Sequence, residues 1–282
     1  MLKRSPKIIL VTPCKNESEN LRGLATSINN LRGDFVYSWV IVVNGSTDNS
    51  IDIAKNLEVT VPLHLLNQES SGNLNDAPEF AAFLLGANNY FHNNIVPTHV
   101  MKLDADVILE NDYFLSLFES ADLGGISGGS LPGEQNDTVP GAVKLYSREA
   151  YDVIRSFPIA LGFDVLDEIA IQQKGLPISI NKESKFRVVR KTASSQGILR
   201  GRFRSGKVCR WTGYFLPYFL LRVIRYSLRS PYGIGAMAMC MGYFSAGEGP
   251  WDKNLKKKMR LIQKMKFYRL IKNPRLIYSI YN

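Results

Sequence analysis

The stretch that decides the fold is SWVIVVNGSTDNSIDIAKNL, residues 38–57. It joins an unbroken β-branched run, typical of a strand covered on both faces, to a polar loop and a helical pattern. The same order occurs at residues 7–31, and TVPLHLLN (60–67) followed by APEFAAFLLGANNYF (77–91) repeats it. Repeated β–α units of this size predict an α/β fold with a doubly wound, mostly parallel sheet.

Polar clusters follow three of the predicted strands, namely TPCKNES (12–18), NGSTD (44–48) and DAD (104–106). In α/β sheets, ligands bind beyond the carboxyl ends of the strands, so these clusters are expected to meet at one edge. Asp104 and Asp106 stand one residue apart, and in a strand such side chains point to the same face.

Two neighbouring carboxylates repel each other unless a cation lies between them. Asp104 and Asp106 offer hard oxygen ligands for Mg²⁺ or Mn²⁺, an ion that usually takes further ligands from substrate phosphates. The alternative is that Asp106 caps the turn before residues 110–118 while Asp104 is merely solvated. The position of the pair at a predicted strand end favours the metal site.

Charge is divided sharply along the 282-residue chain, whose net charge is +10. Residues 1–184 contain 13 Lys and Arg against 23 Asp and Glu, whereas residues 185–282 contain 22 against 2. We therefore predict a catalytic domain over 1–184 and a basic extension over 185–282. The extension's charge indicates a polyanionic partner, either anionic lipid, pyrophosphate or nucleic acid, although an ordinary solvated basic face is the simpler alternative.

Several chemistries find no support in the sequence. It has neither a G-x-x-x-x-G-K-S/T phosphate loop nor a G-x-G-x-x-G motif after its first predicted strand. Its histidines, His64, His92 and His99, form no recognisable triad with a serine or cysteine. Three widely separated cysteines indicate a reducing compartment, and the first predicted strand begins too early for a secretory signal. Phosphate neutralisation is therefore expected to depend on the metal and on basic side chains.

The basic extension begins with RVVRKTASSQGILRGRFRSGKVCR, residues 187–210. Its glycines and serines predict a mobile loop at about 190–210 that closes over a donor diphosphate or grips a phosphorylated acceptor. The candidate residues for this contact are Arg190, Arg200 and Arg202. Simple solvated arginines are the alternative.

Apolar blocks alternate with basic ones in the rest of the extension. WTGYFLPYFLL (211–221) and YGIGAMAMCMGYFSAG (232–247) are too short to span a bilayer, so we expect them to lie in its interface. Residues 253–273 predict a basic amphipathic helix with a stripe of Leu255, Met259, Ile262 and Met265. These features predict a protein peripheral to the inner, cytoplasmic face of the cell membrane, with packing on the catalytic domain or in a homo-oligomer as the alternative.

The order of VTPCKNESENL (11–21), VIVVNGSTDNS (40–50) and MKLDADVIL (101–109) resembles family 2 of the inverting, nucleotide-sugar-dependent glycosyltransferases. The resemblance continues through GGISGGS (124–130), YSREAYDVI (146–154) and GFDVLDEIAIQQKGLPIS (162–179). The extension resembles that of a bacterial and archaeal branch linked to surface-polysaccharide assembly. The resemblance implies a Rossmann-like GT-A fold with a helical C-terminal region, and sugar transfer with inversion onto a lipid-linked or saccharide acceptor.

The resemblance also implies residue roles. In the family, the first strand end borders the nucleoside and the loop after the second strand contacts base and ribose. Asp104 would face the ribose or diphosphate, and Asp106 would be the principal metal ligand. Asn44 stands where the family usually has an aspartate, so it adds a donor and carries no charge; a UDP-sugar is favoured, with guanosine and thymidine left open. The nucleoside residues so implied are Thr12, Pro13, Glu17, Asn44, Ser46 and Asp48.

An inverting transfer needs a base for the acceptor hydroxyl, which in the family is an aspartate at the start of a helix. Here the motif is GFDVLDE (162–168), in which Asp164, Asp167 and Glu168 share one helical face. The sequence leaves the register open. Asp164 is either the base, or the N-cap with Asp167 or Glu168 as the base.

Two other function classes are weighed against this interpretation. A nucleic-acid-binding protein would use the basic extension with aromatic stacking platforms, but the aromatic residues at 211–219 lie in one apolar run and are not interleaved with basic residues. A nucleotidyltransferase would need a basic, glycine-rich loop in place of TPCKNES. We therefore expect a metal-dependent glycosyltransferase that binds no nucleic acid. The aromatic residues concerned are Trp211, Tyr214, Phe215, Tyr218 and Phe219.

Overall fold

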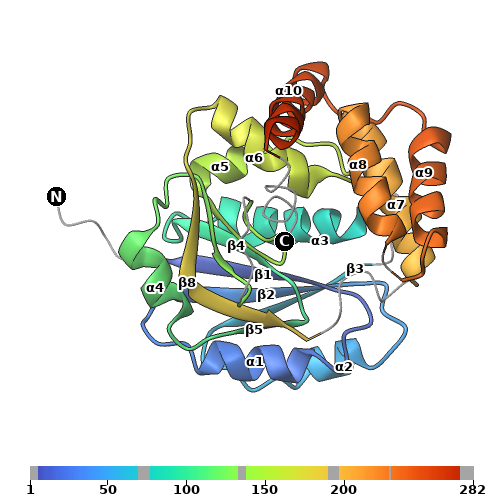
Figure 1. Cartoon of the computed structure of the whole chain (residues 1–282). Coiled ribbons are helices and arrows are strands. Elements are labelled where there is room, and N and C mark those ends of the chain that lie inside the picture. Colours follow the sequence, from blue (N-terminus) through green and yellow to red (C-terminus); the bar gives the residue numbers. More distant parts are fainter. Residues whose placement is uncertain (1–5, 69–76, 133–137, 190–196, 229, 274–282) are drawn as a thin grey trace. The chain divides into compact units, whose positions relative to one another are not determined.

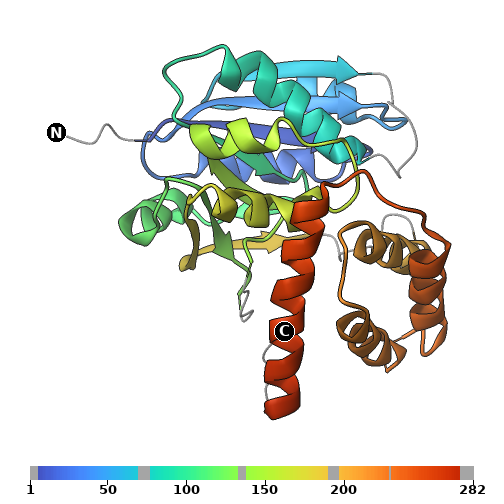
Figure 2. The same ribbon diagram turned by 90° about the horizontal axis from the view of Figure 1, so that it is seen from above.

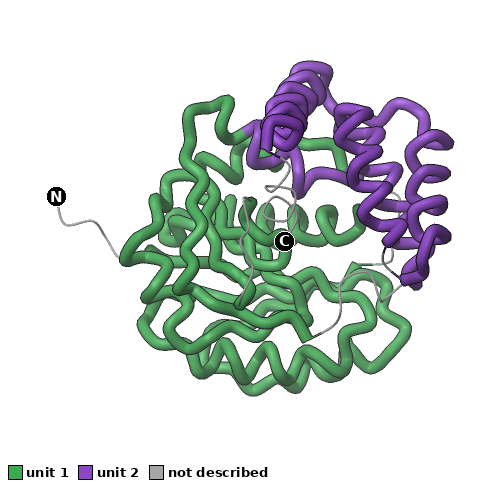
Figure 3. Tube along the Cα trace, viewed as in Figure 1, with its two compact units in different colours: residues 1–159, 171–189 green, residues 160–170, 190–282 purple. Residues whose placement is uncertain are grey.

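The computed structural model describes residues 6–68, 77–132, 138–189, 197–228 and 230–273. The chain divides into two compact units (Figure 3). Unit 1 comprises residues 1–159 and 171–189, and unit 2 comprises residues 160–170 and 190–282. The segment 160–170, which contains the whole acidic motif, is thus grouped with the basic extension.

Unit 1 is built on an eight-stranded sheet in the order β3-β2-β1-β4-β7-β6-β8-β5 (Figure 1). Strands β1 to β4 pair in parallel, as the β–α repeats predict. β7 then pairs antiparallel with β4 and β6, and β8 lies parallel to β6 and antiparallel to β5. The α/β class is confirmed, with a mixed sheet. The strands are β1 (Ile8–Cys14), β2 (Val36–Asn44), β3 (Leu63–Gln68), β4 (His99–Leu103), β5 (Val107–Leu109), β6 (Ile126–Ser130), β7 (Val143–Ser147) and β8 (Ile178–Val188).

Helices cover both faces of the parallel half of the sheet (Figure 1). One face of β1 and β2, including Ile8 and Trp39, shares a core with Leu21 and Leu24 of the first helix. On the other face, Gly86 approaches Val11, which explains why these strands carry apolar residues on both sides. The helices of this unit are α1 (Leu21–Asn29), α2 (Ser50–Lys55), α3 (Pro78–Gly86), the π-helical turn η2 (Ala87–His92), α4 (Tyr113–Ser120) and α5 (Arg148–Ile154).

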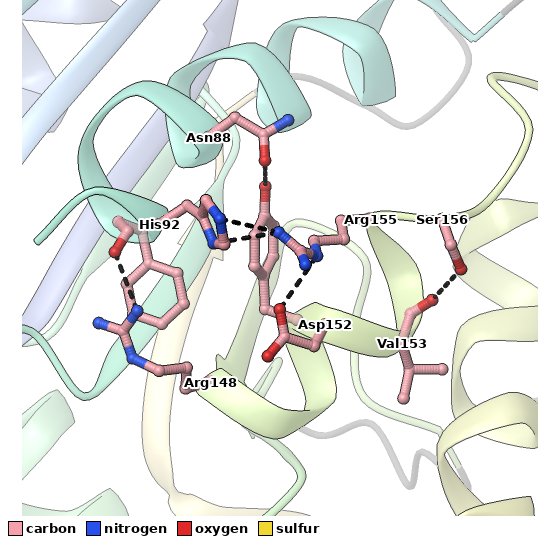
Figure 4. A network of polar contacts seen from close by, with 9 residues as sticks. Asn88, His92, Arg148, Asp152, Val153, Arg155 and Ser156 are labelled. Atoms are coloured by element: carbon pink, nitrogen blue, oxygen red, sulfur yellow. Dashed lines mark hydrogen bonds and ion pairs between the residues drawn. The ribbon is translucent and has the colours of Figure 1, made fainter. Parts of the chain in front are cut away.

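A polar network ties α5 to the π-helical turn η2 (Figure 4). The Tyr151 hydroxyl donates to Asn88 Oδ1 at 2.8 Å, and Arg155 Nη1 lies 3.0 Å from His92 Nδ1. The Arg148 guanidinium donates to three backbone carbonyls in and after the turn, at 2.6–3.2 Å. These contacts satisfy carbonyls that the end of a helix leaves without partners.

Unit 2 is helical. Figure 2 shows α7, α8 and α9 side by side, and the rings of Phe219 and Tyr243 stack between α8 and α9 with centroids 4.1 Å apart. The last helix joins α8 through Phe215, whose backbone N–H donates to Gln263 Oε1 at 2.8 Å. The helices are α6 (Phe163–Gln173, shared with unit 1), α7 (Ile198–Trp211), α8 (Leu216–Ser227), α9 (Ile234–Ser245) and α10 (Lys253–Lys272).

The mobile loop predicted at about 190–210 is wrong for residues 198–210, which belong to helix α7. A Cβ atom on Gly206 would lie 1.9 Å from the Met239 carbonyl, and one on Gly242 would lie 1.9 Å from the Phe203 carbonyl. The glycines that suggested a loop therefore let the α7 and α9 backbones approach closely. Residues 190–196 lie outside the described residues.

The basic helix predicted on residues 253–273 is confirmed as α10, and burial divides its predicted apolar stripe. Leu255 and Met259 are buried, whereas Met265 is exposed together with Leu261 and Tyr268. Helix α10 therefore has one apolar face that is buried and another that remains at the surface. No described helix is long and apolar enough to cross a membrane.

The helix crossing in unit 2 can be tested with Gly206→Ala. The added methyl group would meet the Met239 carbonyl, so we expect a loss of about 1–3 kcal/mol in the free energy of unfolding. Urea unfolding followed by circular dichroism measures it. Gly247→Ala is the control, because a Cβ there meets nothing within 4 Å. Equal unfolding midpoints for the two variants would contradict the close crossing.

Candidate active site

Hydrogen bonds join the loops that follow β1 and β2. Asn16 has a left-handed backbone (φ 56°), and its Oδ1 accepts from the Thr47 backbone N–H at 2.8 Å. Three successive backbone N–H groups of the first loop donate to side chains of the second: Asn16 to Ser46 Oγ (3.1 Å), Glu17 to Ser50 Oγ (2.8 Å) and Ser18 to Asp48 Oδ2 (3.1 Å). The predicted clusters TPCKNES and NGSTD thus form one structure at the carboxyl edge of the sheet.

The Asp48 carboxylate joins the two loops through hydrogen bonds. Its Oδ1 accepts from the Ser50 backbone N–H at 3.0 Å and from the Ser50 hydroxyl at 2.5 Å, while Oδ2 accepts from Ser18. Partial burial acts to raise the pKa of Asp48, but the hydrogen bonds from Ser50 and Ser18 outweigh it and lower the pKa to about 2. The carboxylate is therefore ionised at neutral pH and holds the two loops together.

The residues predicted to contact the nucleoside differ in accessibility. Thr12 is fully buried, and its Oγ1 accepts from Trp39 Nε1 at 2.9 Å. Asn44 is 3% exposed and donates to the Pro78 carbonyl at 3.2 Å, at the start of α3. The buried Thr12 and Asn44 side chains therefore support the loops through hydrogen bonds within the protein. Pro13, Glu17, Ser46 and Asp48 are half-buried at the surface of the joined loops.

The acidic pair lies beyond the strand next to β1. β4 pairs with β1 so that Lys102 is opposite Val11, and β4 ends at Leu103. Asp104 and Asp106 are in the turn that leads to β5, where Asp104 N–H donates to the Ala142 carbonyl at 3.0 Å. Both side chains are half-buried, while Ala105 between them is buried. The two carboxylates thus keep the alternation expected of a strand although the strand has ended.

Lys102 is a residue that the sequence analysis missed. It is only 5% exposed, and its ammonium group contacts the Asp104 carboxylate and donates to the Gly141 carbonyl at 3.0 Å. A buried charge requires such partners, so the ammonium group both needs Asp104 and offsets its negative charge. The available signal was a lysine inside an apolar strand, two residues before an aspartate.

Asp104 and Asp106 could form part of a ligand set for a divalent cation. Within the described ranges, no group of three or more His, Cys, Asp and Glu side chains is placed to hold a metal ion. Two half-buried carboxylates fit an ion that takes its other ligands from water and substrate phosphates, which is the usual behaviour of Mg²⁺. The donor chemistry is therefore compatible with metal binding that depends on the substrate.

The acidic motif is helical, as predicted, but burial separates its members. Asp164 is the second residue of α6 and is exposed, so it lies inside the first turn and is not the N-cap. Asp167 is 1% exposed and Glu168 8% exposed, and the Glu168 backbone N–H donates to Asp167 Oδ1 at 2.7 Å. Of the three candidates, Asp164 is the one accessible to an acceptor.

The start of α6 is held by residues of the basic extension. The Trp251 indole N–H donates to the Leu161 carbonyl at 2.9 Å. Gly162 has φ +92°, and a Cβ there would lie 2.4 Å from Thr212 Cγ2. The backbone that leads into Asp164 is therefore fixed by packing within unit 2.

The predicted arginines and aromatic rings are placed differently from expectation. Arg190 lies outside the described residues, Arg200 is exposed on α7, and the guanidinium of Arg202 lies 3.7 Å from the Tyr226 ring centroid. Among the aromatic residues, Phe219 is buried in its stack with Tyr243. The face of the Phe219 ring is therefore used inside the unit and is not open to stacking with a base.

Comparison with known proteins identifies the fold. No protein-family model matches the chain, and no curated protein sequence matches it. S. aureus TarS 1-349 in complex with UDP is similar in structure, with a TM-score of 0.51 and 13% identity over 84% of this chain and 70% of that one. The fold is GT-A. Likeness at this identity concerns the fold alone.

Two further structures agree with this assignment. Glucosyl-3-phosphoglycerate synthase from Mycobacterium tuberculosis, in complex with Mn²⁺, UDP and phosphoglyceric acid, gives a TM-score of 0.52 and 13% identity, covering 72% of this chain and 78% of that one. A longer S. aureus TarS structure gives a TM-score of 0.50 and 12% identity, covering 84% of this chain and 43% of that one. The fold therefore matches solved structures of different lengths.

The role of Asp48 predicts a pH-dependent stability. Its pKa of about 2 lies below the ordinary value of 3.8, so its contribution is present above about pH 4 and is lost as the pH falls towards 2. We expect Asp48→Asn to lower the free energy of unfolding by about 1 kcal/mol at pH 7, after allowance for solvent screening, and by less at pH 3. Urea unfolding at both pH values measures this. Asp52→Asn, an exposed change on α2, is the control; a loss of unfolding free energy in Asp48→Asn that does not change with pH would contradict this role of the Asp48 carboxylate.

Proposed function

We propose that this protein is a metal-dependent, inverting glycosyltransferase of the family 2 type that uses a UDP-sugar as donor. The observation that carries the proposal is the turn with Asp104 and Asp106, which follows the strand beside β1 in a GT-A sheet. Beyond β1 and β2, the joined loops add half-buried polar groups at the same carboxyl edge. Ligands of open α/β sheets bind at such an edge.

The donor is proposed to bind along this edge. Pro13, Glu17 and Ser46 are the accessible candidates for contact with the nucleoside, while Thr12, Asn44 and Asp48 hold the loops in shape. UDP is favoured because the TarS and glucosyl-3-phosphoglycerate synthase structures both contain it. In this assignment the shape of the loops is the main selector of the donor's nucleotide base, since the Asn44 carboxamide is buried.

Asp106, with Asp104, would hold Mg²⁺ or Mn²⁺. The ion would supply positive charge to the diphosphate of the donor; the synthase structure contains Mn²⁺ together with UDP. Lys102 holds the Asp104 side chain by its ion pair and offsets the negative charge of that carboxylate before the donor arrives. Asp104 is therefore proposed to act on the ribose or diphosphate as well as on the ion.

Asp164 is proposed as the general base. In an inverting transfer, the acceptor oxygen forms a bond to the anomeric carbon on the face opposite the departing nucleoside diphosphate, and the carboxylate takes the hydroxyl proton. Asp164 is exposed in the first turn of α6, whereas Asp167 and Glu168 are buried. Arg190 and Arg200 remain proposed contacts for a phosphorylated group. Arg202 instead makes a cation–π contact with the Tyr226 ring.

The acceptor is proposed to be a lipid-linked or saccharide precursor of a surface polysaccharide. The basic extension, with 22 Lys and Arg against 2 Asp and Glu, supports a location on the cytoplasmic face of the cell membrane. A peripheral enzyme in this position would meet lipid-linked acceptors at the bilayer surface.

The donor site is tested by thermal stabilisation. UDP and UDP-sugars are expected to raise the melting temperature in the presence of Mn²⁺ or Mg²⁺, and chelation should remove most of the shift. Asp106→Asn is expected to abolish the dependence on metal. Glu110→Gln is the matched control, being an exposed carboxylate four residues away. The donor-site assignment fails if no nucleotide stabilises the protein, or if Asp106→Asn responds to metal and UDP as the native chain does.

The base is tested by Asp164→Asn. Loss of a general base is expected to lower kcat by about 10²–10⁴-fold while leaving the KM for the donor nearly unchanged. Glu149→Gln is the control because Glu149 is likewise exposed at the second position of a helix. A kcat for Asp164→Asn close to that of the control would move the assignment to Asp167 or Glu168.

A further inference from the structure

Exposed apolar side chains are concentrated in unit 2. In the part of the chain that the structure describes, six large hydrophobic residues exposed to solvent belong to unit 1 and sixteen belong to unit 2. Unit 2 is the smaller unit, so its surface is unusually apolar. Isolated exposed hydrophobic residues are normal, but a contiguous set marks an interaction surface.

The exposed residues follow helical spacing on two neighbouring helices. Along and directly after α8 they recur every four residues, and along α9 they recur at intervals of three and four, so each set forms a stripe. The opposite sides of both helices are already used, since Phe219 and Met239 are buried in the core of the unit. We name these two stripes the α8/α9 face, formed by Leu216, Leu220, Ile224, Leu228, Ile234, Met237, Met241 and Phe244, which are 43–73% exposed.

We propose that the α8/α9 face docks onto the surface of an anionic lipid bilayer. The inference deepens the proposed function, and it rests on that function for the lipid-linked acceptor that the docking would serve. None of the described helices can span a bilayer. Apolar stripes of this length, in a unit whose helices α7 and α10 are basic, are suited to the boundary between headgroups and acyl chains.

Charge identifies the partner as a lipid surface. Residues 185–282 carry 22 Lys and Arg against 2 Asp and Glu, so pairing with a second copy of the chain would bring two strongly basic units together. Anionic headgroups would instead attract this charge while the acyl region receives the apolar stripes. A neutral apolar protein partner would leave the positive charge uncompensated.

Helix α10 repeats the same chemistry. Its exposed residues Leu261 and Met265 lie between exposed lysines, including Lys257 and Lys264. Long basic side chains of this kind place their charged ends among headgroups while their methylene groups cover apolar surface. The surface of α10 thus adds a second basic element with the same preference for an anionic bilayer.

The test is co-sedimentation of the full chain with phosphatidylcholine vesicles, with and without about 30% phosphatidylglycerol. We expect binding to the anionic vesicles that weakens at high salt, and little binding to the neutral ones. The variant Met237→Gln, Met241→Gln, Phe244→Gln is expected to lower the partition coefficient by about tenfold or more. All three positions are exposed, so circular dichroism should show an unchanged fold.

The matched control is Ile95→Gln, Val96→Gln, Leu115→Gln, which removes three exposed apolar side chains from unit 1 and should leave vesicle binding unchanged. Equal binding by the native chain and the α9 variant would overturn the proposal. So would light scattering that shows a dimer dissociated by the α9 substitutions. Stabilisation by UDP is measured on the same proteins. Vesicle binding without stabilisation by UDP would support the docking and reject the donor site. Stabilisation by UDP without vesicle binding would reject the docking alone.

Discussion

The proximity of Asp104 and Asp106 is the electrostatic constraint on which the candidate site depends. Both carboxylates are half-buried in one turn, and the residue between them is buried. The Lys102 ammonium offsets one of the two charges. Two carboxylates at this edge of the sheet are suited to a divalent cation that takes its other ligands from a substrate.

Side chains that hydrogen-bond within the protein hold the loops at the same edge of the sheet. Asp48 holds two loops through Ser18 and Ser50, and Thr12 supports them through Trp39. Because these side chains are used internally, the accessible polar groups are held on a fixed backbone. Preorganisation of this kind reduces the ordering that a bound nucleotide must impose.

The sequence was most informative where a signal is local. The long β-branched runs at 8–14 and 36–44 form β1 and β2, and the polar clusters after them do meet at one edge. The antiparallel half of the sheet gave no such signal. In β6, ISGGS, Gly129 is required because a Cβ there would lie 1.9 Å from the Ser184 carbonyl. Such a contact between distant segments leaves no periodic pattern in the sequence.

The site residues, too, depend on tertiary contacts that the sequence pattern does not reveal. Spacing placed Asp164, Asp167 and Glu168 on one helix, but only tertiary packing buries the last two and leaves the first accessible. Glycines in residues 198–210 indicated a loop by composition, yet Gly206 serves a helix crossing whose partner is more than 30 residues away in sequence. Lys102 was missed because its burial depends on neighbouring strands.

The placement of Asp164 changes how the basic extension is understood. The segment 160–170 is compact with residues 190–282, and Trp251 and Thr212 fix the backbone directly before Asp164. The proposed base therefore depends on the folding of the extension, although the two are separated in sequence. An extension that also presents an apolar, basic surface would then couple two requirements of a membrane-associated transferase, namely an ordered base and a means of reaching a lipid-linked acceptor. In this interpretation the 20 basic residues of 190–282 and the acidic motif belong to one functional element.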